Sequence, residues 1–196
     1  MENPIIQEEK PGIGILGVLA SIIGGVIGAA IFGYVYFFIA IRWEMDSVAI
    51  FAALFGALAG AVAGLAARKM GMLNTKLLIV LGVFVGIASY GVRYVFEYND
   101  FVAVIVGSEY SSGTETAAAR KEFSEFFALL YPPGGVPGYL KLVAEGGLSI
   151  STGPAPMEGD PNVSGIGVWL ILLLETVVAG VMGVVGTVKT ALGDWN

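Results

Sequence analysis

Cysteine and histidine are both absent from this sequence of 196 residues. Without cysteine there is no disulfide and no thiolate nucleophile, and without histidine the commonest zinc sites and the usual axial ligand of haem are excluded. No Gly-x-Ser-x-Gly motif and no glycine-rich phosphate loop with its lysine occurs either. The alternating oxygen-bearing side chains from Glu158 to Ser164 lack the central glycine and the final glutamate of a calcium loop. We therefore expect a protein without metal or cofactor that is not an enzyme.

Charged side chains are scarce as well. They make up 13% of the sequence, whereas 56% is hydrophobic, and the mean hydropathy is +0.82. The net charge of -6 argues against a phosphate-binding surface, so we expect no nucleic-acid partner. The apolar residues form long runs that almost lack charge, as helices surrounded by lipid require. The composition therefore predicts an all-α integral membrane protein that is embedded in the lipid bilayer.

Four of the apolar runs are long enough to cross a bilayer, which takes about 20 residues. We expect these transmembrane helices at residues 12–41, 48–67, 76–94 and 166–188. The first run is overlong, so its helix is expected to tilt or to protrude from the membrane. It is preceded by Glu8 and Glu9 rather than by a basic segment, which favours a retained helix over a cleavable signal peptide.

The basic residues of the short loops predict the orientation of the chain. Arg68, Lys69 and Lys76 share the loop between the second and third spans, and such loops face the cytoplasm. The tails 1–11 and 189–196 then lie in the cytoplasm too. The sequence therefore predicts a multi-pass protein, most simply of a bacterial cytoplasmic membrane, with both termini inside.

The segment 95–165 is then extracytoplasmic, and it holds nine of the sixteen acidic residues. Ser112 and Glu115 resemble a capping box at the start of a helix, and the double proline at 132–133 would stop that helix. A shorter helix is expected from about Pro137 to Glu145. The first of these helices carries apolar residues at helical spacing, which we expect to dock on a partner protein or to pack on the ends of the membrane helices: Phe123, Phe126, Phe127, Leu130 and Tyr131.

Small residues recur at intervals of four in the first three predicted spans. This spacing lets helix backbones approach closely in lipid, where no hydrophobic drive brings helices together. The residues are Gly17, Ser21, Gly24, Gly25 and Gly28 in the first span, Gly56, Gly60 and Gly64 in the second, and Gly82 and Gly86 in the third. Because a short linker joins the first two spans, we expect these two to form the closest helix pair. A glycine-lined path or a seam between copies is the alternative.

Glu175 is the one ionisable residue deep within a predicted span. From the helical rise it lies about 14 Å from the outer end of that span, which is close to the middle of the bilayer. A buried carboxyl group in the membrane is usually paired with a cation or with hydrogen-bond donors. Arg93, near the outer end of the third span, is the candidate ion-pair partner, because the two side chains could bridge their difference in depth.

These features leave two functions open. The small size and the lack of reactive groups favour a non-catalytic membrane subunit or scaffold of a larger membrane protein assembly, in contact with other subunits or with copies of itself. The alternative is a small proton or cation transporter or channel that uses Glu175. A transporter usually shows several intramembrane polar sites and inverted repeats, whereas this sequence shows one acid and no convincing repeat.

Overall fold

The computed structural model describes residues 15–43, 49–72, 74–107, 113–149 and 162–193. These ranges contain the helices α1 (Ile15–Trp43), α2 (Ile50–Lys69), α3 (Thr75–Gly107), α4 (Gly113–Leu130), α5 (Gly135–Gly146) and α6 (Ile166–Leu192). They also contain a short antiparallel ladder of β1 (Leu148–Ser149) and β2 (Asn162–Val163). Four of the helices, α1, α2, α3 and α6, are long and apolar enough to span a membrane. The prediction of an all-α membrane protein with about four transmembrane helices is confirmed.

One helix differs clearly from its predicted length. The sequence placed the end of the third span at residue 94, but α3 continues without interruption to Gly107. Its 33 residues measure about 50 Å, so α3 reaches well beyond a hydrocarbon core of about 30 Å. The charged pair at the expected boundary does not end the helix, because Arg93 and Glu97 form an ion pair one turn apart.

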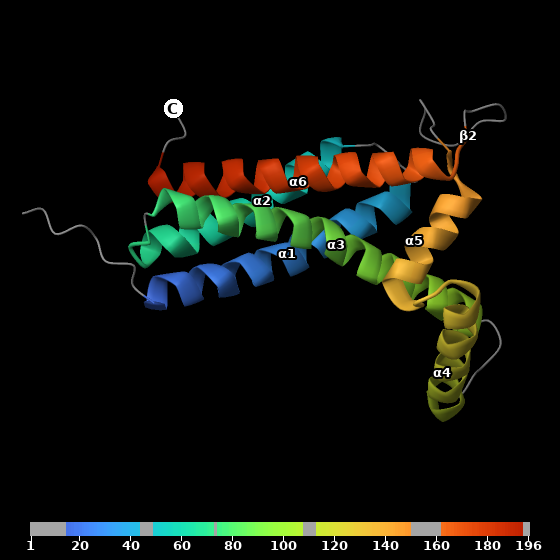
Figure 1. Cartoon of the computed structure of the whole chain (residues 1–196). Coiled ribbons are helices and arrows are strands. Elements are labelled where there is room, and N and C mark those ends of the chain that lie inside the picture. The colour runs from blue at the N-terminus through green and yellow to red at the C-terminus, as the bar shows by residue number, and fades with distance from the viewer. Residues whose placement is uncertain (1–14, 44–48, 73, 108–112, 150–161, 194–196) are drawn as a thin grey trace, which may run out of the picture.

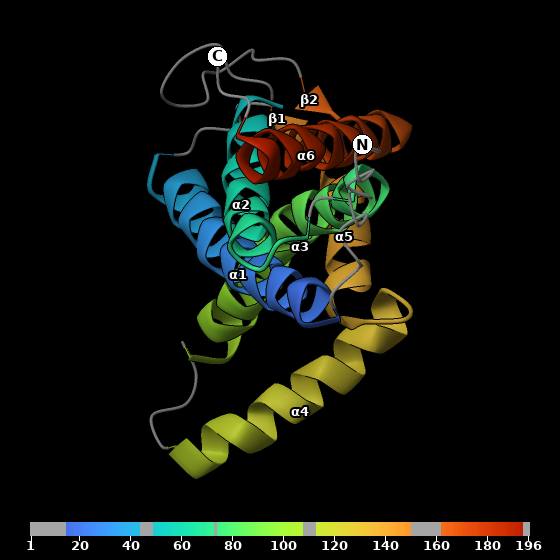
Figure 2. The same ribbon diagram turned by 90° about the vertical axis from the view of Figure 1, so that its left-hand side faces the viewer.

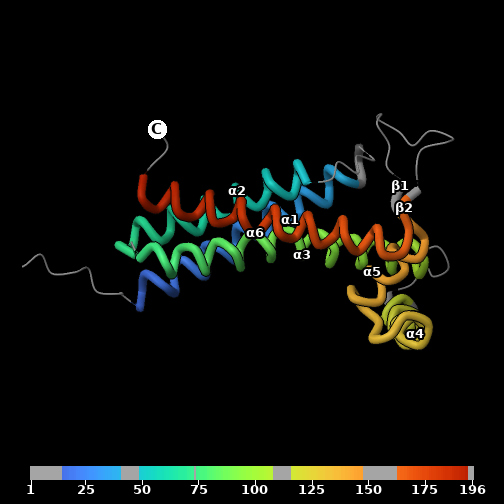
Figure 3. The backbone as a smooth tube through the Cα atoms, turned by 45° about the horizontal axis from the view of Figure 1, so that its top comes forward, coloured from blue at the N-terminus to red at the C-terminus, as the bar shows by residue number. Residues whose placement is uncertain are grey.

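The four long helices lie side by side along one axis, and α4 and α5 sit at one end of them (Figure 1). The start of α1, the turn between α2 and α3, and the end of α6 lie together at the opposite end (Figures 1 and 3). In the end-on view, α1 and α6 lie on opposite sides of the α2–α3 pair (Figure 2). The helix contacts agree, because α6 packs on α2 and α3, and α1 packs on the same two helices.

The closest helix pair is α2 with α6 rather than α1 with α2. A Cβ atom added at Gly56 would lie 2.5 Å from the carbonyl oxygen of Ala179, and one at Gly64 would strike the carbonyl oxygen of Thr187. This register means that α2 and α6 run in the same direction with their backbones in contact. The expected α1–α2 pair was wrong because α6 carries its own series of small residues, which we did not recognise in the sequence.

The small residues of α3 and α1 also face neighbouring helices. A Cβ atom at Gly82 would lie 2.6 Å from the Cα atom of Val184, so α3 also meets the backbone of α6. In α1, Gly24 and Gly28 face α2, whereas Gly25 faces Val85 of α3. Small residues therefore mediate close contacts in all four helices, and α6 receives the closest of them.

The remaining predicted packing residues lie on the same inner surfaces. Gly86 faces Ala179 of α6, and Gly60 faces Gly183. Gly17 lies against Met70 and Met72 near the end of α2, one turn before the buried Ser21. Ser21 donates a hydrogen bond to the carbonyl oxygen of Gly17 at 2.7 Å, so its hydroxyl is satisfied within its own helix.

Candidate functional site

Glu175 is buried in the bundle with a residue exposure of 5%. It stands one turn before Ala179 on the face of α6 that packs against α2 and α3. The register of α2 and α6 places Ala52, in the first turn of α2, opposite Glu175. Because a helical side chain leans toward the N-terminus of its helix, the carboxyl group points to that start.

The carboxyl group accepts two hydrogen bonds from different helices. The backbone N–H of Ala49, which immediately precedes α2, donates to Oε1 at 3.1 Å. The hydroxyl of Tyr90 in α3 donates to Oε2 at 2.5 Å. An acidic group at a helix N-terminus satisfies an N–H that has no partner within the helix and interacts favourably with the helix dipole. Glu175 thus caps α2 from a neighbouring helix and ties α2, α3 and α6 together.

This position corrects the depth that we expected for Glu175. The carboxyl group lies level with the start of α2 instead of near the middle of the bundle. The first turns of α6 account for the difference, because they lie beyond α2 and pack on α5. Val168 is fully buried there in a cluster with Ala144 of α5. Counting residues from the start of α6 therefore did not predict that Glu175 lies level with the start of α2.

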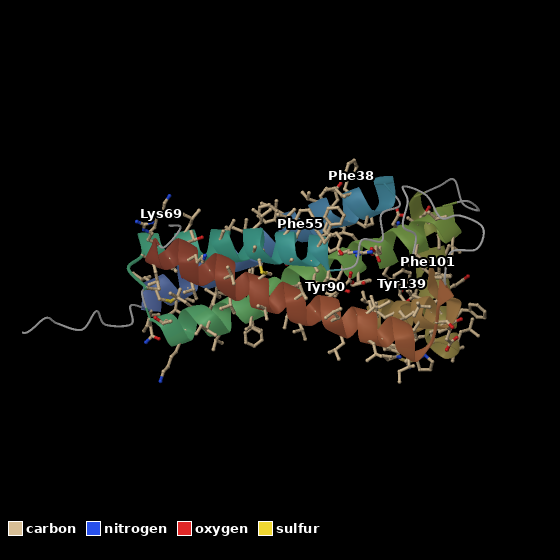
Figure 4. All side chains as sticks on the ribbon, turned by 90° about the horizontal axis from the view of Figure 1, so that it is seen from above. Phe38, Phe55, Lys69, Tyr90, Phe101 and Tyr139 are labelled. Carbon is tan, nitrogen blue, oxygen red and sulfur yellow. The ribbon has the colours of Figure 1, made fainter. Side chains whose placement is uncertain are left out.

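Two tyrosines extend the hydrogen-bonded series away from Glu175. The hydroxyls of Tyr90 and Tyr94 lie 2.9 Å apart, and their rings meet edge to face with centroids 5.2 Å apart. Both side chains are buried, and Figure 4 shows Tyr90 inside the bundle toward the end that carries α5. Tyr90 and Tyr94 continue the four-residue spacing of Gly82 and Gly86 along α3, so the same helix face changes from glycine to tyrosine.

Arg93 belongs to this cluster, but Glu175 is not its ion-pair partner. Its Nε donates to Glu97 of the same helix. Its Nη1 donates to the hydroxyl of Tyr36 in α1 at 2.7 Å. The guanidinium also lies over the rings of Tyr36 and Tyr94, 4.5 Å and 5.2 Å from their centroids, in cation–π geometry. The proposed direct Arg93–Glu175 pair is replaced by these contacts, because Arg93 lies on the side of α3 that faces α1.

The sequence reasoning missed the tyrosines and Ala49 as partners of Glu175. Tyr90 follows Gly86 by four residues, and this spacing places its hydroxyl on the face of α3 that contacts α6. That spacing could have identified Tyr90 as a partner of Glu175. No sequence signal identified the N–H of Ala49. Its φ of 68° lies in the left-handed region that alanine rarely adopts, and only the folded backbone reveals it.

The apolar residues expected on the outer helix α4 divide into two groups. Phe127 is buried, and it contacts the rings of Phe101 and Tyr98 in α3. Phe123 stacks on Phe127, and Tyr131 also contacts it. These side chains pack within the chain. Phe126 and Leu130 remain exposed, together with Leu129, which we had not singled out.

Comparison of the chain with models of known protein families, with curated proteins and with solved structures finds no match. In the described part of the chain, no group of three or more acidic side chains is placed to hold a metal ion. The geometry of the cluster around Glu175 and of the outer helices is therefore the basis for a functional proposal.

Proposed function

We propose that the protein is a non-catalytic integral membrane subunit or scaffold of a larger membrane assembly. The observation that carries this proposal is the position of α4. This helix lies crosswise to the bundle axis at its outer end, and it projects to one side of the four long helices (Figures 1 and 2). It leaves Phe126, Leu129 and Leu130 exposed, with Leu129 at 80%. Clustered apolar side chains on a projecting surface are typical of protein–protein contacts.

The opposite side of α4 holds this surface in place. Phe123 and Phe127 pack against Phe101 of α3, and the chain after α4 packs back onto it, since a Cβ atom at Gly138 would meet the carbonyl oxygen of Tyr131. A surface that is already ordered loses little conformational entropy when a partner binds. The long extension of α3 beyond the membrane thereby supports a docking helix.

Site-specific photo-crosslinking in native membranes tests this proposal. A photoreactive amino acid at Leu129 should yield one discrete cross-linked product with a partner subunit or a second copy. The same amino acid at Ser124, which is exposed on another side of α4, is the matched control and should yield none. Equal and diffuse labelling at both positions would contradict a docking role for this surface.

Both termini are proposed to face the cytoplasm, with α4 and α5 on the other side of the membrane. The support is the charge of the described residues at the end where α1 starts: Arg68, Lys69, Lys76 and Lys189 are all basic. Basic residues flanking membrane helices are retained on the cytoplasmic side. This orientation would present α4 to extracytoplasmic partners.

A second function, proton or cation transport through Glu175, has one observation in its favour. Tyr90 and Tyr94 form a hydrogen-bonded series with Glu175, which is the arrangement that a proton relay uses. Toward the other end of the bundle, however, the backbones of α2 and α6 meet at Gly60 and Gly183 with no room for a methyl group. Both carboxyl oxygens also serve in holding helices together, and this favours the structural role.

A further inference from the structure

A groove of about 430 Å³ runs along the lipid-facing side of the bundle between α1 and α3. Its walls are Val18, Ile22 and Val26 on α1 and Leu77, Val80 and Phe84 on α3. All six side chains are apolar. Val26, Val80 and Phe84 are each more than half exposed in the isolated chain, so the groove opens toward the membrane.

The length of the groove restricts what can fill it. On α3 its lining extends from Leu77 to Ala88, which corresponds to about 17 Å along the helix. One leaflet of the hydrocarbon core is about 15 Å thick, whereas a partner helix that crosses the membrane would follow a groove of about 30 Å. The groove therefore matches a single acyl chain of one leaflet.

The groove begins at the basic end of the bundle. Met72 and Leu77 line it there, and Lys76 stands one turn before Val80 at the start of α3. Arg68 and Lys69 end α2 at the same end of the bundle, where Figure 4 shows Lys69. A lysine at the edge of a membrane extends its ammonium group to the level of the lipid headgroups, where basic clusters attract anionic lipids.

We propose that this groove is a binding site for one acyl chain of an anionic phospholipid, in the leaflet that faces the basic end. The chain lies between α1 and α3, and the phosphate interacts with Lys76. This site is independent of the docking role proposed for α4.

A second lipid-facing groove provides an internal comparison. It lies between α3 and α6 and is lined by Val83, Ile87 and Thr176 together with valines of α6. On α3 its lining extends only from Val83 to Ile87, about 6 Å, although on α6 it reaches Val185, one turn before Lys189. The second groove therefore has a basic residue near one end but lacks the leaflet-long apolar wall on α3 that marks the first groove.

Photoreactive phospholipids test the proposal on the full-length protein in phosphatidylcholine liposomes. The probe is phosphatidylglycerol with a diazirine in one acyl chain, and the cross-linked residues are mapped by mass spectrometry. We expect labelling of residues 18–26 and 77–88 several-fold above other lipid-facing residues. Val26→Trp and Val80→Trp, which fill the groove from opposite walls, should each reduce that labelling several-fold.

The matched controls are Ile27→Trp and Ile79→Trp, because these neighbours are similarly exposed but do not line the groove. They should leave labelling unchanged. Lys76→Gln should lower labelling by the phosphatidylglycerol probe but not by its phosphatidylcholine counterpart. Labelling that is uniform over the lipid-facing surface, or equal in Val80→Trp and Ile79→Trp, would show bulk lipid only and overturn the site. Disulfide-linked dimers of Val80→Cys would assign the groove to a second copy instead.

Discussion

The bundle is held together in two different ways along its length. In the half that ends at the basic loop, α2 and α3 touch the backbone of α6 at glycines such as Gly60 and Gly86. In the other half, large rings pack between α1, α2 and α3, because Tyr36 stacks on Phe55 with centroids 5.3 Å apart and also contacts Tyr90. Glu175 stands at the boundary between the two halves.

The difference shows how each half achieves its stability in lipid. Helix backbones in contact are stabilised by dispersion attraction, which acts in lipid although no hydrophobic drive brings helices together. Such contacts leave no space for an added side-chain atom. Rings fill more space between helices than glycine does, and buried hydroxyls such as that of Tyr90 need partners inside the protein. The first half should therefore be sensitive to side-chain volume and the second half to hydrogen bonding.

The largest effect is expected from Gly60→Leu. The new side chain would collide with the backbone of Gly183, where neither helix can shift without losing its other contacts. We expect little or no folded protein, measured as monodisperse yield and thermal stability in mild detergent. Gly91→Leu is the control, because a side chain at Gly91 would meet open space. If the Gly60→Leu protein matched wild type in both measurements, the proposed α2–α6 interface would be wrong.

Replacing single glycines of α3 by alanine separates the effect of helix packing on stability from the effect of helix propensity. Gly86→Ala places a methyl group against the carbonyl oxygen of Ala179 and should destabilise the protein by about 1–3 kcal/mol. Gly91→Ala, five residues further on, should stabilise it by about 0.5–1 kcal/mol, since glycine is the poorer helix former. Unfolding titrations in detergent measure both. The same sign for the two variants would contradict the contrast between packed and open faces of α3.

In the other half the test is the loss of hydrogen bonds. Glu175→Leu leaves the N–H of Ala49 and the hydroxyl of Tyr90 without their acceptor, which should cost about 1–3 kcal/mol, and Glu175→Gln should cost less. A double-mutant cycle of Glu175→Gln with Tyr90→Phe should give a coupling of about 0.5–2 kcal/mol. The same cycle with Arg93→Gln should give a much smaller one, because Arg93 pairs with Glu97. A larger coupling to Arg93 than to Tyr90 would restore the direct ion pair.

The smallest effect on stability is expected from single cysteine substitutions that test the orientation of the chain in the membrane. Lys69→Cys and Lys121→Cys place single thiols at exposed positions at opposite ends of the molecule, and the native chain contributes no other cysteine. An impermeant maleimide added to intact cells should label Lys121→Cys and spare Lys69→Cys. The reverse pattern would place the basic loop outside.

The sequence was sufficient to predict the helices but not their pairing. Apolar runs and the double proline after Tyr131 act locally, so the predicted spans and the two outer helices lie close to those of the structure, except that α3 continues to Gly107. Pairing depends on which two series of small residues pack against each other. Because several helices carry such a series, the sequence allows several arrangements. The series Ala179, Gly183 and Thr187 in α6 was visible in the sequence, but nothing local indicated that it would be the shared surface.

The same limit applies to Glu175. Its burial was predictable from an acid in an apolar run, but its partners depend on the register of three helices. The helix cap at Ala49 requires α2 and α6 to run in parallel with Ala52 opposite Glu175. That relation arises from contacts more than 120 residues apart in the sequence, since the Ala49–Glu175 hydrogen bond has a separation of 126.

Proton flux into liposomes tests most directly whether Glu175 is structural. Wild-type protein and Glu175→Gln would be reconstituted at equal density, and a pH-sensitive dye inside the liposomes would report acidification under an imposed pH gradient. We expect both proteins to give the flux of protein-free liposomes, because the carboxyl group serves to hold α2, α3 and α6 together. A wild-type flux that Glu175→Gln abolishes in a still-folded protein would contradict the scaffold role and establish transport.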